Sequence, residues 1–226
     1  MAGTIGRGRR SPPRARETVE AVRAILAGER AAYSGEHVRT HGFRLRQPLP
    51  DAKITLAAFG PNTTRVAAAT ADEIVLNLVT PERVARVREI VAAEAHARDR
   101  APPEIAVWVT VSLDPGTAAL AQMAAQIAVY LRPPGYGEMF AELGFGTLVD
   151  RARAGAKRSE LAREITTELL GQVCAIGSAD EVRGRLASYV DAGATRIGVV
   201  PVTAEDPAGH RVLAGLAPHA AEVRAA

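Results

Sequence analysis

Short apolar runs with the length of β-strands alternate along most of this chain with segments long enough to form helices. The runs are residues 54–59 (ITLAAF), 73–78 (EIVLNL), 105–113 (IAVWVTVSL) and 196–202 (RIGVVPV). Strands joined by crossovers of ten or more residues pair in parallel as right-handed βαβ units. We therefore predict an α/β fold with a parallel sheet, built from four or five such units.

Helix start and stop signals lie between these runs. Thr80 precedes Pro81 as an N-cap residue before a proline at the first helical position, and Ser178 is a second N-cap. The predicted helices are residues 14–27, a helix that follows a turn at residues 60–62 and runs through residue 71, and residues 81–98, 117–131 and 180–192, with two more helical segments before Ser178. Residues 33–50 carry glycines and prolines among scattered hydrophobic residues, which predicts a small hairpin or excursion outside the main repeat.

Length and composition limit the class of protein. With 226 residues the chain can bury one sizeable core, and we predict a single domain over residues 1–226. Aromatic residues make up only 4%, so Ala, Val, Leu and Ile must form most of that core, as in helix-covered parallel sheets. No apolar run reaches the roughly 18–20 residues that span a bilayer, and the N-terminus lacks a secretory signal. We therefore expect a soluble, cytoplasmic protein with no membrane partner.

Residue types that often bind metals give no metal-site signal here. Cys174 is the only cysteine, which excludes an internal disulfide and any zinc site with several thiolates, and its apolar surroundings are typical of a core residue. The histidines lie in charged or loop segments, and no two have ligand spacing on one helix face. They are His37, His41, His96, His210 and His219. We predict surface histidines and no metal.

The densest charge run is GRGRRSPPRAR, residues 6–16, which in isolation is typical of a disordered arm that binds nucleic acid. It contains no aromatic residue for base stacking, and the net charge of the whole chain is only +3. Glu17 and Glu20 follow at once on the predicted helix. This pattern favours a phosphate site followed by a solvated helix, and we expect no nucleic-acid partner.

Two segments have the chemistry of anion sites. In residues 4–9 (TIGRGR) the glycines let the backbone approach an anion, and Arg7 can offer two parallel hydrogen bonds to phosphate oxygens. In residues 58–64 (AFGPNTT) a strand ends, a Gly-Pro turn follows, and hydroxyl groups stand at a helix N-terminus. The alternative is that Asn62 or Thr63 only caps this helix, and spacing alone favours capping.

Several motifs in order resemble the luciferase-like monooxygenases, and more narrowly their branch that uses coenzyme F420. They are IGRG at 5–8, LAAFGPNTTRVAAATADEIVLN at 56–77, TPERV at 80–84, LRPPGYGEMFAELGFG at 131–146 and IGSADEVRGRLASYVDAGATRIGVVPV at 176–202. The resemblance covers the chain from about residue 4. It implies a (β/α)8 TIM-barrel fold, here incomplete, because relatives have about three βα units before the IGRG loop.

The resemblance also implies a cofactor site. In this family an arginine of the IGRG-like loop and the strand-to-helix turn in the position of FGPNTT hold the cofactor phosphate. Carried across by position, the cofactor-binding residues are Arg7, Gly8, Arg9, Phe59, Gly60, Thr63 and Thr64. Phe59 and Gly60 stand where some flavin-using members have an acidic residue and a serine. These departures favour F420 as the cofactor, with FMN second.

The resemblance implies an oxidoreductase that transfers a hydride to or from a small organic substrate, and family members are often homodimers. The βα units that relatives carry at the front supply several candidate catalytic side chains, so we nominate no catalytic acid, base or nucleophile in this sequence. The alternative is a catalytically silent protein that binds a flavin or deazaflavin. Tyr136 and Phe140 either line a substrate mouth or form one helix turn that packs inward.

Overall fold

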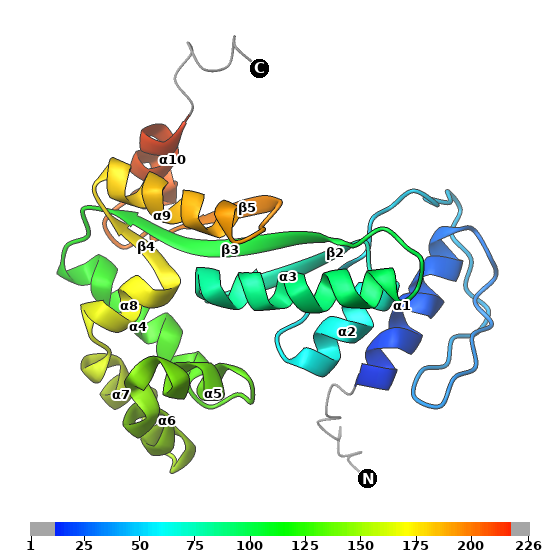
Figure 1. Ribbon diagram of the computed structural model, residues 1–226, viewed down its shortest axis with the longest axis horizontal. Helices are drawn as coiled ribbons and strands as arrows, with labels where there is room; N and C mark the ends of the chain where they lie inside the picture. Colours follow the sequence, from blue (N-terminus) through cyan, green and yellow to red (C-terminus); the bar gives the residue numbers. More distant parts are fainter. Residues whose placement is uncertain (1–11, 218–226) are drawn as a thin grey trace. The chain divides into compact units, whose positions relative to one another are not determined.

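The computed structural model describes residues 12–217, in which strands and helices alternate as Figure 1 shows. The strand ladders are parallel, which confirms the α/β class. Two compact units are present within the described residues. Unit 1 comprises residues 12–75 and 87–104, and unit 2 comprises residues 76–86 and 105–217. The single domain over residues 1–226 stays a prediction.

Five strands lie in the described part of the chain, and four of them match predicted runs. They are β1 (Thr55–Ala57), β2 (Glu73–Asn77), β3 (Glu104–Leu113) and β5 (Arg196–Pro201). The remaining strand, β4 (Cys174–Gly177), lies in a segment for which no strand is predicted. It has four residues and directly follows the last residue of a helix, so no turn signal separates the two elements.

Unit 1 contains two complete helices and the short strand β1, which pairs with β2. Its helical elements are α1 (Pro12–Leu26), α2 (Pro61–Thr70) and the later part of α3 (Pro81–His96). β1 and β2 pair in parallel, with Ala57 opposite Val75. Ala67, Ala68 and Ala71 have no exposed surface, which agrees with a core made largely of small aliphatic residues.

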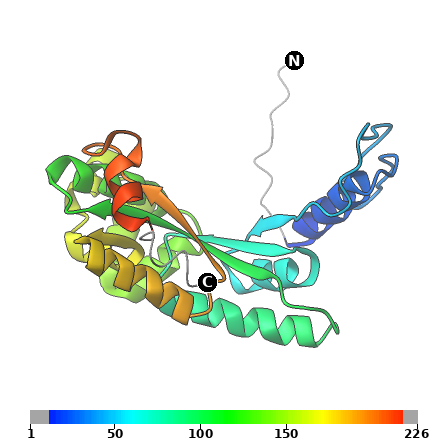
Figure 2. The same ribbon diagram turned by 90° about the horizontal axis from the view of Figure 1, so that it is seen from above.

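A small hairpin lies beside α1 in the predicted excursion, as Figures 1 and 2 show. Ser34 and Arg39 form an antiparallel bridge. The Glu17 carboxylate of α1 accepts hydrogen bonds from the N–H groups of residues 36–38, at 3.1, 2.7 and 2.7 Å. Burial raises the pKa of Glu17, but these backbone hydrogen bonds and the nearby His37 outweigh it and hold the pKa below its ordinary value. An ionised Glu17 therefore anchors the hairpin on α1.

Asp72 connects α1 to the strands of unit 1. Its Oδ2 atom accepts hydrogen bonds from the Arg23 guanidinium at 2.9 Å and from the Ile54 N–H at 2.8 Å. Burial raises the pKa of Asp72, but the Ile54 hydrogen bond and the Arg23 guanidinium outweigh it and lower the pKa. The charged form of Asp72 therefore stabilises the folded state.

We expect Asp72→Asn to lower the free energy of unfolding by about 1–2 kcal/mol, because an amide cannot replace the charge that pairs with Arg23. A lowered folded pKa means that this stabilisation is present above the unfolded value of 3.8 and is lost as the pH falls through the folded value. In urea unfolding, the difference between wild type and variant should therefore shrink from about pH 7 to about pH 3. Asp191→Asn, which changes an exposed carboxyl group, is the control, and an equal loss in both variants would contradict the assignment.

Unit 2 is built around β3, which pairs in parallel with β4 along one edge and with β5 along the other. Thr110 lies opposite Cys174 of β4, and Trp108 lies opposite Gly198 of β5. A Cβ atom at Gly198 would lie 2.6 Å from Cδ1 of Trp108, so the glycine makes room for the indole ring. Strands of a closed (β/α)8 barrel pair in sequence order. The order β4–β3–β5 differs from that order, so these three strands form an open sheet.

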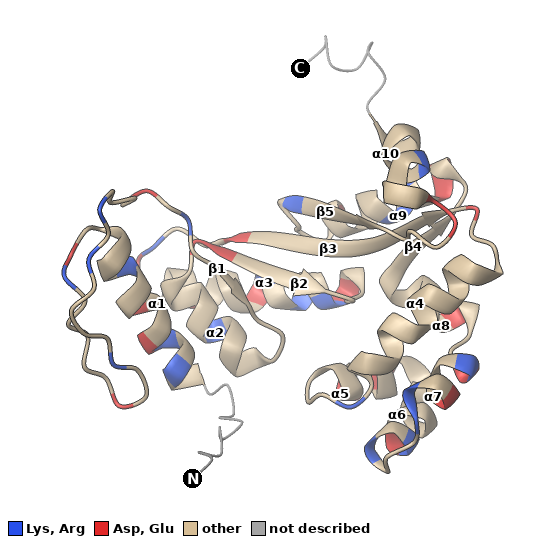
Figure 3. Cartoon of the chain, turned by 180° about the vertical axis from the view of Figure 1, so that it is seen from behind, with Lys and Arg blue, Asp and Glu red and all other residues tan. Residues whose placement is uncertain are grey.

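Helices join these strands in the order that the sequence predicts, but the structure has more helical segments than predicted. The helices are α4 (Thr117–Tyr130), α5 (Tyr136–Phe140), the π-helical turn Ala141–Phe145, α6 (Gly146–Arg153), α7 (Arg158–Glu164), α8 (Thr167–Val173), α9 (Ala179–Asp191) and α10 (His210–Leu216). Ser178 caps α9 as predicted, in a capping box with Glu181. Between α4 and Ser178 the structure has four short helices and the π-helical turn where the sequence predicts two helical segments, and α10 is absent from the prediction. Figure 3 shows acidic and basic residues interspersed on α6 and α7, where Arg151 pairs with Glu164.

Two classes of feature are absent from the described residues. No helix within residues 12–217 is long and apolar enough to cross a membrane. The same residues contain no group of three or more His, Cys, Asp or Glu side chains arranged to hold a metal ion.

Candidate functional site

The turn between β1 and α2 brings together the four predicted site residues that lie in the described part of the chain. These residues are Phe59, Gly60, Thr63 and Thr64, and all belong to unit 1. Gly60 is the N-cap residue of α2, with an extended backbone at φ −84° and ψ 161°, and Pro61 follows at the first helical position. An apolar run followed by a Gly-Pro turn predicts a strand end and a helix that begins near the proline, and the structure has both.

The threonine hydroxyl groups point back to the turn instead of capping the helix. The Thr63 and Thr64 hydroxyls donate hydrogen bonds to the Gly60 carbonyl oxygen at 2.9 and 3.0 Å. No side chain caps α2, so the alternative that Asn62 or Thr63 serves only as a cap is wrong. Asn62 Oδ1 instead accepts a hydrogen bond from Arg65 at 3.1 Å.

An uncapped helix start leaves backbone donors for an anion. Pro61 has no N–H, so the first-turn donors are the N–H groups of Asn62 and Thr63, which have no acceptor within the helix. The helix dipole adds partial positive charge at the same end. A Cβ atom at Gly60 would find nothing nearer than Thr63 Oγ1 at 3.9 Å, so there is room beside the backbone for a bound group. The turn therefore has the donors and the space that a phosphate needs.

The two threonines have different surroundings. Thr63 is half-buried, and its hydroxyl can rotate toward a ligand, whereas Thr64 has no exposed surface. Thr64 therefore supports the turn from the core, and Thr63 is the hydroxyl that a ligand can reach. The other three predicted residues, Arg7, Gly8 and Arg9, lie outside the described residues, so the complete site stays a prediction.

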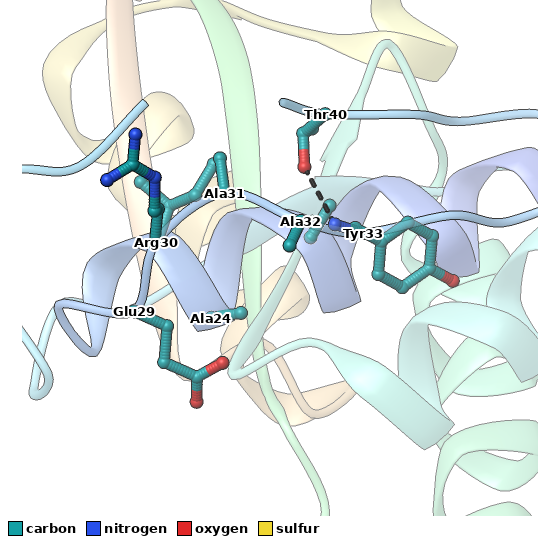
Figure 4. Close-up of a pocket in the computed structure, with 9 residues that line it drawn as sticks. Ala24, Glu29, Arg30, Ala31, Ala32, Tyr33 and Thr40 are labelled. Atoms are coloured by element: carbon teal, nitrogen blue, oxygen red, sulfur yellow. Dashed lines mark hydrogen bonds between the residues drawn. The ribbon is translucent and has the colours of Figure 1, made fainter. Parts of the chain in front are cut away.

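A hollow lies elsewhere in unit 1, between α1 and the hairpin. It has a volume of about 250 Å³ and is lined by Ala21, Ala24 and Ile25 of α1, by residues 29–33 and by Thr40. Figure 4 shows Thr40 accepting a hydrogen bond from the Tyr33 N–H across the hairpin, at 3.1 Å. None of the predicted site residues in the described chain lines this hollow, which belongs to the packing of the hairpin on α1.

Histidine and cysteine take structural or surface positions. His37, His41, His96 and His210 are exposed, which confirms the prediction for these four, and His219 lies outside the described residues. Burial raises the pKa of the Cys174 thiol to about 12, although the Arg185 guanidinium acts in the opposite direction. A thiol with that pKa stays protonated at neutral pH, so Cys174 is an inert core residue.

The sequence leaves open whether Tyr136 and Phe140 line a substrate mouth or pack inward, and the two residues differ in the structure. Phe140 has no exposed surface and packs inward. Tyr136 is half-buried, and its hydroxyl donates a hydrogen bond to the backbone oxygen of Asn77 at 3.0 Å. Sequence reasoning did not single out Asn77, because no local signal links it to a tyrosine 59 residues away.

Parallel strands joined by helices define an α/β protein, and the uncapped helix start after β1 is its candidate anion site. The model of the luciferase-like monooxygenase family matches residues 6–196, so the chain belongs to this family. The match confirms the resemblance that the motifs carry.

Named relatives in the comparison are oxidoreductases. The 5,10-methylenetetrahydromethanopterin reductase of Methanolobus tindarius is 25% identical over 193 residues, which cover 80% of this chain and 58% of that protein. The structure of coenzyme F420-dependent tetrahydromethanopterin reductase from Methanopyrus kandleri matches with a TM-score of 0.70 and 18% identity, over 91% of this chain and 60% of that one. An F420-dependent secondary alcohol dehydrogenase, solved with an F420-acetone adduct, matches with a TM-score of 0.65 and 13% identity, over 89% of this chain and 61% of that one.

These similarities show that this chain shares a fold with the solved structures and covers only part of the length of each relative. The structural matches share the α/β fold with this chain, and the fold of these relatives is the luciferase-like barrel type that the motifs imply. The chain spans about three-fifths of the length of each of these relatives.

Proposed function

We propose that this chain is a coenzyme F420-dependent oxidoreductase of the luciferase-like family that transfers a hydride between the cofactor and a small organic substrate. The observation that carries the proposal is the uncapped start of α2, where Gly60, the backbone of Asn62 and the Thr63 hydroxyl offer an anion site. Arg7, with the Gly8 and Arg9 backbone, completes the phosphate contacts.

The choice of F420 over FMN has two supports. Phe59 and Gly60 replace the acidic residue and serine of some flavin-using members. The names of two structural relatives contain F420. A bound deazaflavin supplies the hydride acceptor or donor, while the protein supplies phosphate binding, orientation and exclusion of water.

Cofactor titration of the Thr63→Val variant tests the phosphate site. Valine keeps the shape of threonine and removes the hydroxyl, so we expect F420 to bind about 3–10-fold more weakly, the effect of one lost hydrogen bond. Fluorescence titration with F420 and with FMN measures both affinities. Thr70→Val is a matched control at the other end of α2, where the hydroxyl donates to the Val66 carbonyl at 2.8 Å.

The outcomes separate the candidate functions. Saturable F420 binding that weakens in Thr63→Val and stays constant in Thr70→Val supports the site. A wild-type chain that binds neither F420 nor FMN contradicts the proposal. Cofactor binding without reduction or oxidation of any organic substrate in a panel supports the silent binding protein instead.

We propose a homodimer as the assembly. Unit 2 exposes large apolar side chains, with 52% of Trp108, 54% of Val190 and 55% of Leu213 accessible, and exposed apolar surface favours association. Light scattering should give about twice the chain mass of 23.8 kDa. A mass equal to one chain at all concentrations would contradict the dimer.

A further inference from the structure

Strand β5 has a free edge in unit 2, where it runs along β3 (Figure 3). In the described part of the chain it pairs with β3 alone, so its second edge faces no other strand. Side-chain burial shows the same opening. Ile197 and Val199 of β5 are half-buried, whereas Val107 and Val109, which lie opposite them on β3, are each only 1% exposed. Unpaired strand edges pair readily with a strand of another chain.

The hydrogen-bond pattern shows which backbone groups lie on this β5 edge. The Val202 N–H donates to the Val111 carbonyl oxygen of β3 at 2.9 Å. Because successive residues of a strand direct their N–H and C=O groups to opposite edges, Ile197, Val199 and Pro201 direct theirs away from β3. Pro201 has no N–H, and an outward position on an edge strand is where a proline fits. The Ile197 and Val199 N–H groups are therefore the donors that the β5 edge offers.

Apolar side chains stand on one face of the sheet beside this edge. Trp108 is 52% exposed and Val200 is 39% exposed. Trp108 lies opposite Gly198, which is two residues before Val200 on β5, so the two exposed side chains share a face. The Trp108 indole lies close over Gly198, since a Cβ atom there would be 2.6 Å from its Cδ1 atom. The ring therefore extends over β5 toward the free edge.

The β5 edge is complementary to itself. A strand that pairs with an identical strand across a twofold axis runs antiparallel to it. When Ile197 lies opposite the partner's Val199, each N–H and C=O group of the two residues has a partner in the other chain, and Gly198 lies beside the partner's Gly198. A shift of register in one direction places Ile197 opposite the partner's Pro201, which has no N–H to donate. A shift in the other direction requires the Thr195 N–H, which already donates to β3.

Charge and area set the strength of this contact. In this register Val200 lies beside the partner's Arg196, so the two Arg196 side chains stay about 13 Å apart, beyond the Debye length at physiological salt. A paired six-residue strand together with Trp108 and Val200 buries on the order of 350 Å² per chain, or roughly 700 Å² in total. Stable complexes bury about 1,200 Å² or more, so this pairing alone gives a weak, reversible dimer.

We propose that the β5 edge binds the β5 edge of a second copy of this chain, with the two strands antiparallel and both Trp108 side chains covered. The inference rests on the proposed homodimer and names its contact surface. The pairing joins two sheets into one, and the dimer dissociates in the micromolar range. The turn between β1 and α2 belongs to unit 1, so cofactor binding and dimer formation are measured separately.

Charge substitution at Val200 tests the pairing, because two variants are expected to have effects of opposite sign. Val200→Glu places a carboxylate beside the partner's Arg196 twice per dimer, so we expect association about 3–10-fold tighter at low salt. Val200→Lys places a cation there and should weaken association by a similar factor. Sedimentation equilibrium of the full chain over a dilution series measures each association constant.

Two further measurements sharpen this test. Trp108 is the only tryptophan in the chain, so its fluorescence reports on this surface. We expect acrylamide to quench it strongly in dilute protein and less in concentrated protein, over the concentrations at which the mass doubles. Val190→Glu and Val190→Lys are matched controls on α9, where Val190 is 54% exposed, and they should leave the association constant unchanged. All four variants change exposed side chains and should melt near the wild-type temperature.

The outcomes distinguish this contact surface from the homodimer itself. Opposite shifts in the two Val200 variants, with Trp108 shielded only in the dimer, support the proposal. A dimer with the same association constant in wild type and both Val200 variants has another contact surface, which overturns this inference and leaves the homodimer standing. A single-chain mass at all concentrations overturns both, while F420 titration of the same protein decides the cofactor proposal. Trp108 that is already shielded in the monomer is covered by another segment of the chain, which also overturns the inference.

Discussion

Replacing Tyr189 with alanine is expected to lower the free energy of unfolding by about 3–5 kcal/mol, the range for removing a large buried aromatic side chain. Tyr189 lies in α9 and has no exposed surface. Its hydroxyl donates to the Val79 carbonyl oxygen at 2.7 Å, and the Arg185 guanidinium carbon lies 5.2 Å from the ring centre. Alanine would leave a cavity in the core, the Val79 carbonyl without its donor, and the Arg185 guanidinium without the aromatic ring.

Urea unfolding of three variants separates these contributions. Tyr189→Phe keeps the ring and leaves Val79 without its donor, so we expect a loss of about 1–3 kcal/mol. Burial raises the pKa of Tyr189 to about 12, so the hydroxyl is a neutral donor throughout the ordinary pH range. Tyr33→Phe changes a half-exposed tyrosine and is the control. A loss below about 1 kcal/mol for Tyr189→Ala, with an unchanged denaturant slope, would contradict its place in the core.

Tyr189 also shows which features of the fold are encoded locally. The helix that contains it is predictable, because Ser178 and Glu181 form a capping box three residues apart. The partner of its hydroxyl is not, because Val79 lies 110 residues earlier in the chain. The strand order β4–β3–β5 is a pairing of the same distant kind. Caps and apolar runs therefore predict elements, and tertiary packing decides their neighbours.

Short elements escaped the sequence prediction for a different reason. β4 has four residues between a helix and the next cap, too few to display a strand period. The helix α10 begins at His210, after Gly209 with φ 71°, and no Ser, Thr, Asp or Asn caps it at that position. Asp206 performs this role from four residues earlier, since its carboxylate accepts from the Arg211 and Val212 N–H groups.

The candidate site likewise has features that local sequence predicts and features that only the fold determines. Phe59, Gly60, Thr63 and Thr64 are neighbours in sequence, so a strand end followed by a Gly-Pro turn is enough to group them. The sequence could not show that the threonine hydroxyls point to the Gly60 carbonyl, which decides between capping and an open helix start. Asn77, by contrast, meets Tyr130 and Tyr136 only through folding.

Arg7→Ala is expected to weaken F420 binding about 10–100-fold, the effect of losing charge-assisted hydrogen bonds to a phosphate. The prediction comes from the IGRG segment, because Arg7 lies outside the described residues. If Arg7 holds the phosphate through two parallel hydrogen bonds, Arg7→Lys should recover only part of the affinity, since lysine offers a point charge without the planar fork. Fluorescence titration with F420 at two salt concentrations measures both effects.

Arg14→Ala is the matched control, because Arg14 comes from the same arginine-rich stretch and is exposed on α1. General attraction between a basic segment and an anionic cofactor would make both alanine variants lose affinity equally, and the loss would disappear at high salt. A phosphate site predicts a loss confined to Arg7 that persists at high salt. Together with Thr63→Val, this comparison asks whether an arginine near the N-terminus and the start of α2 hold one ligand, because the double variant should lose more affinity than either single change.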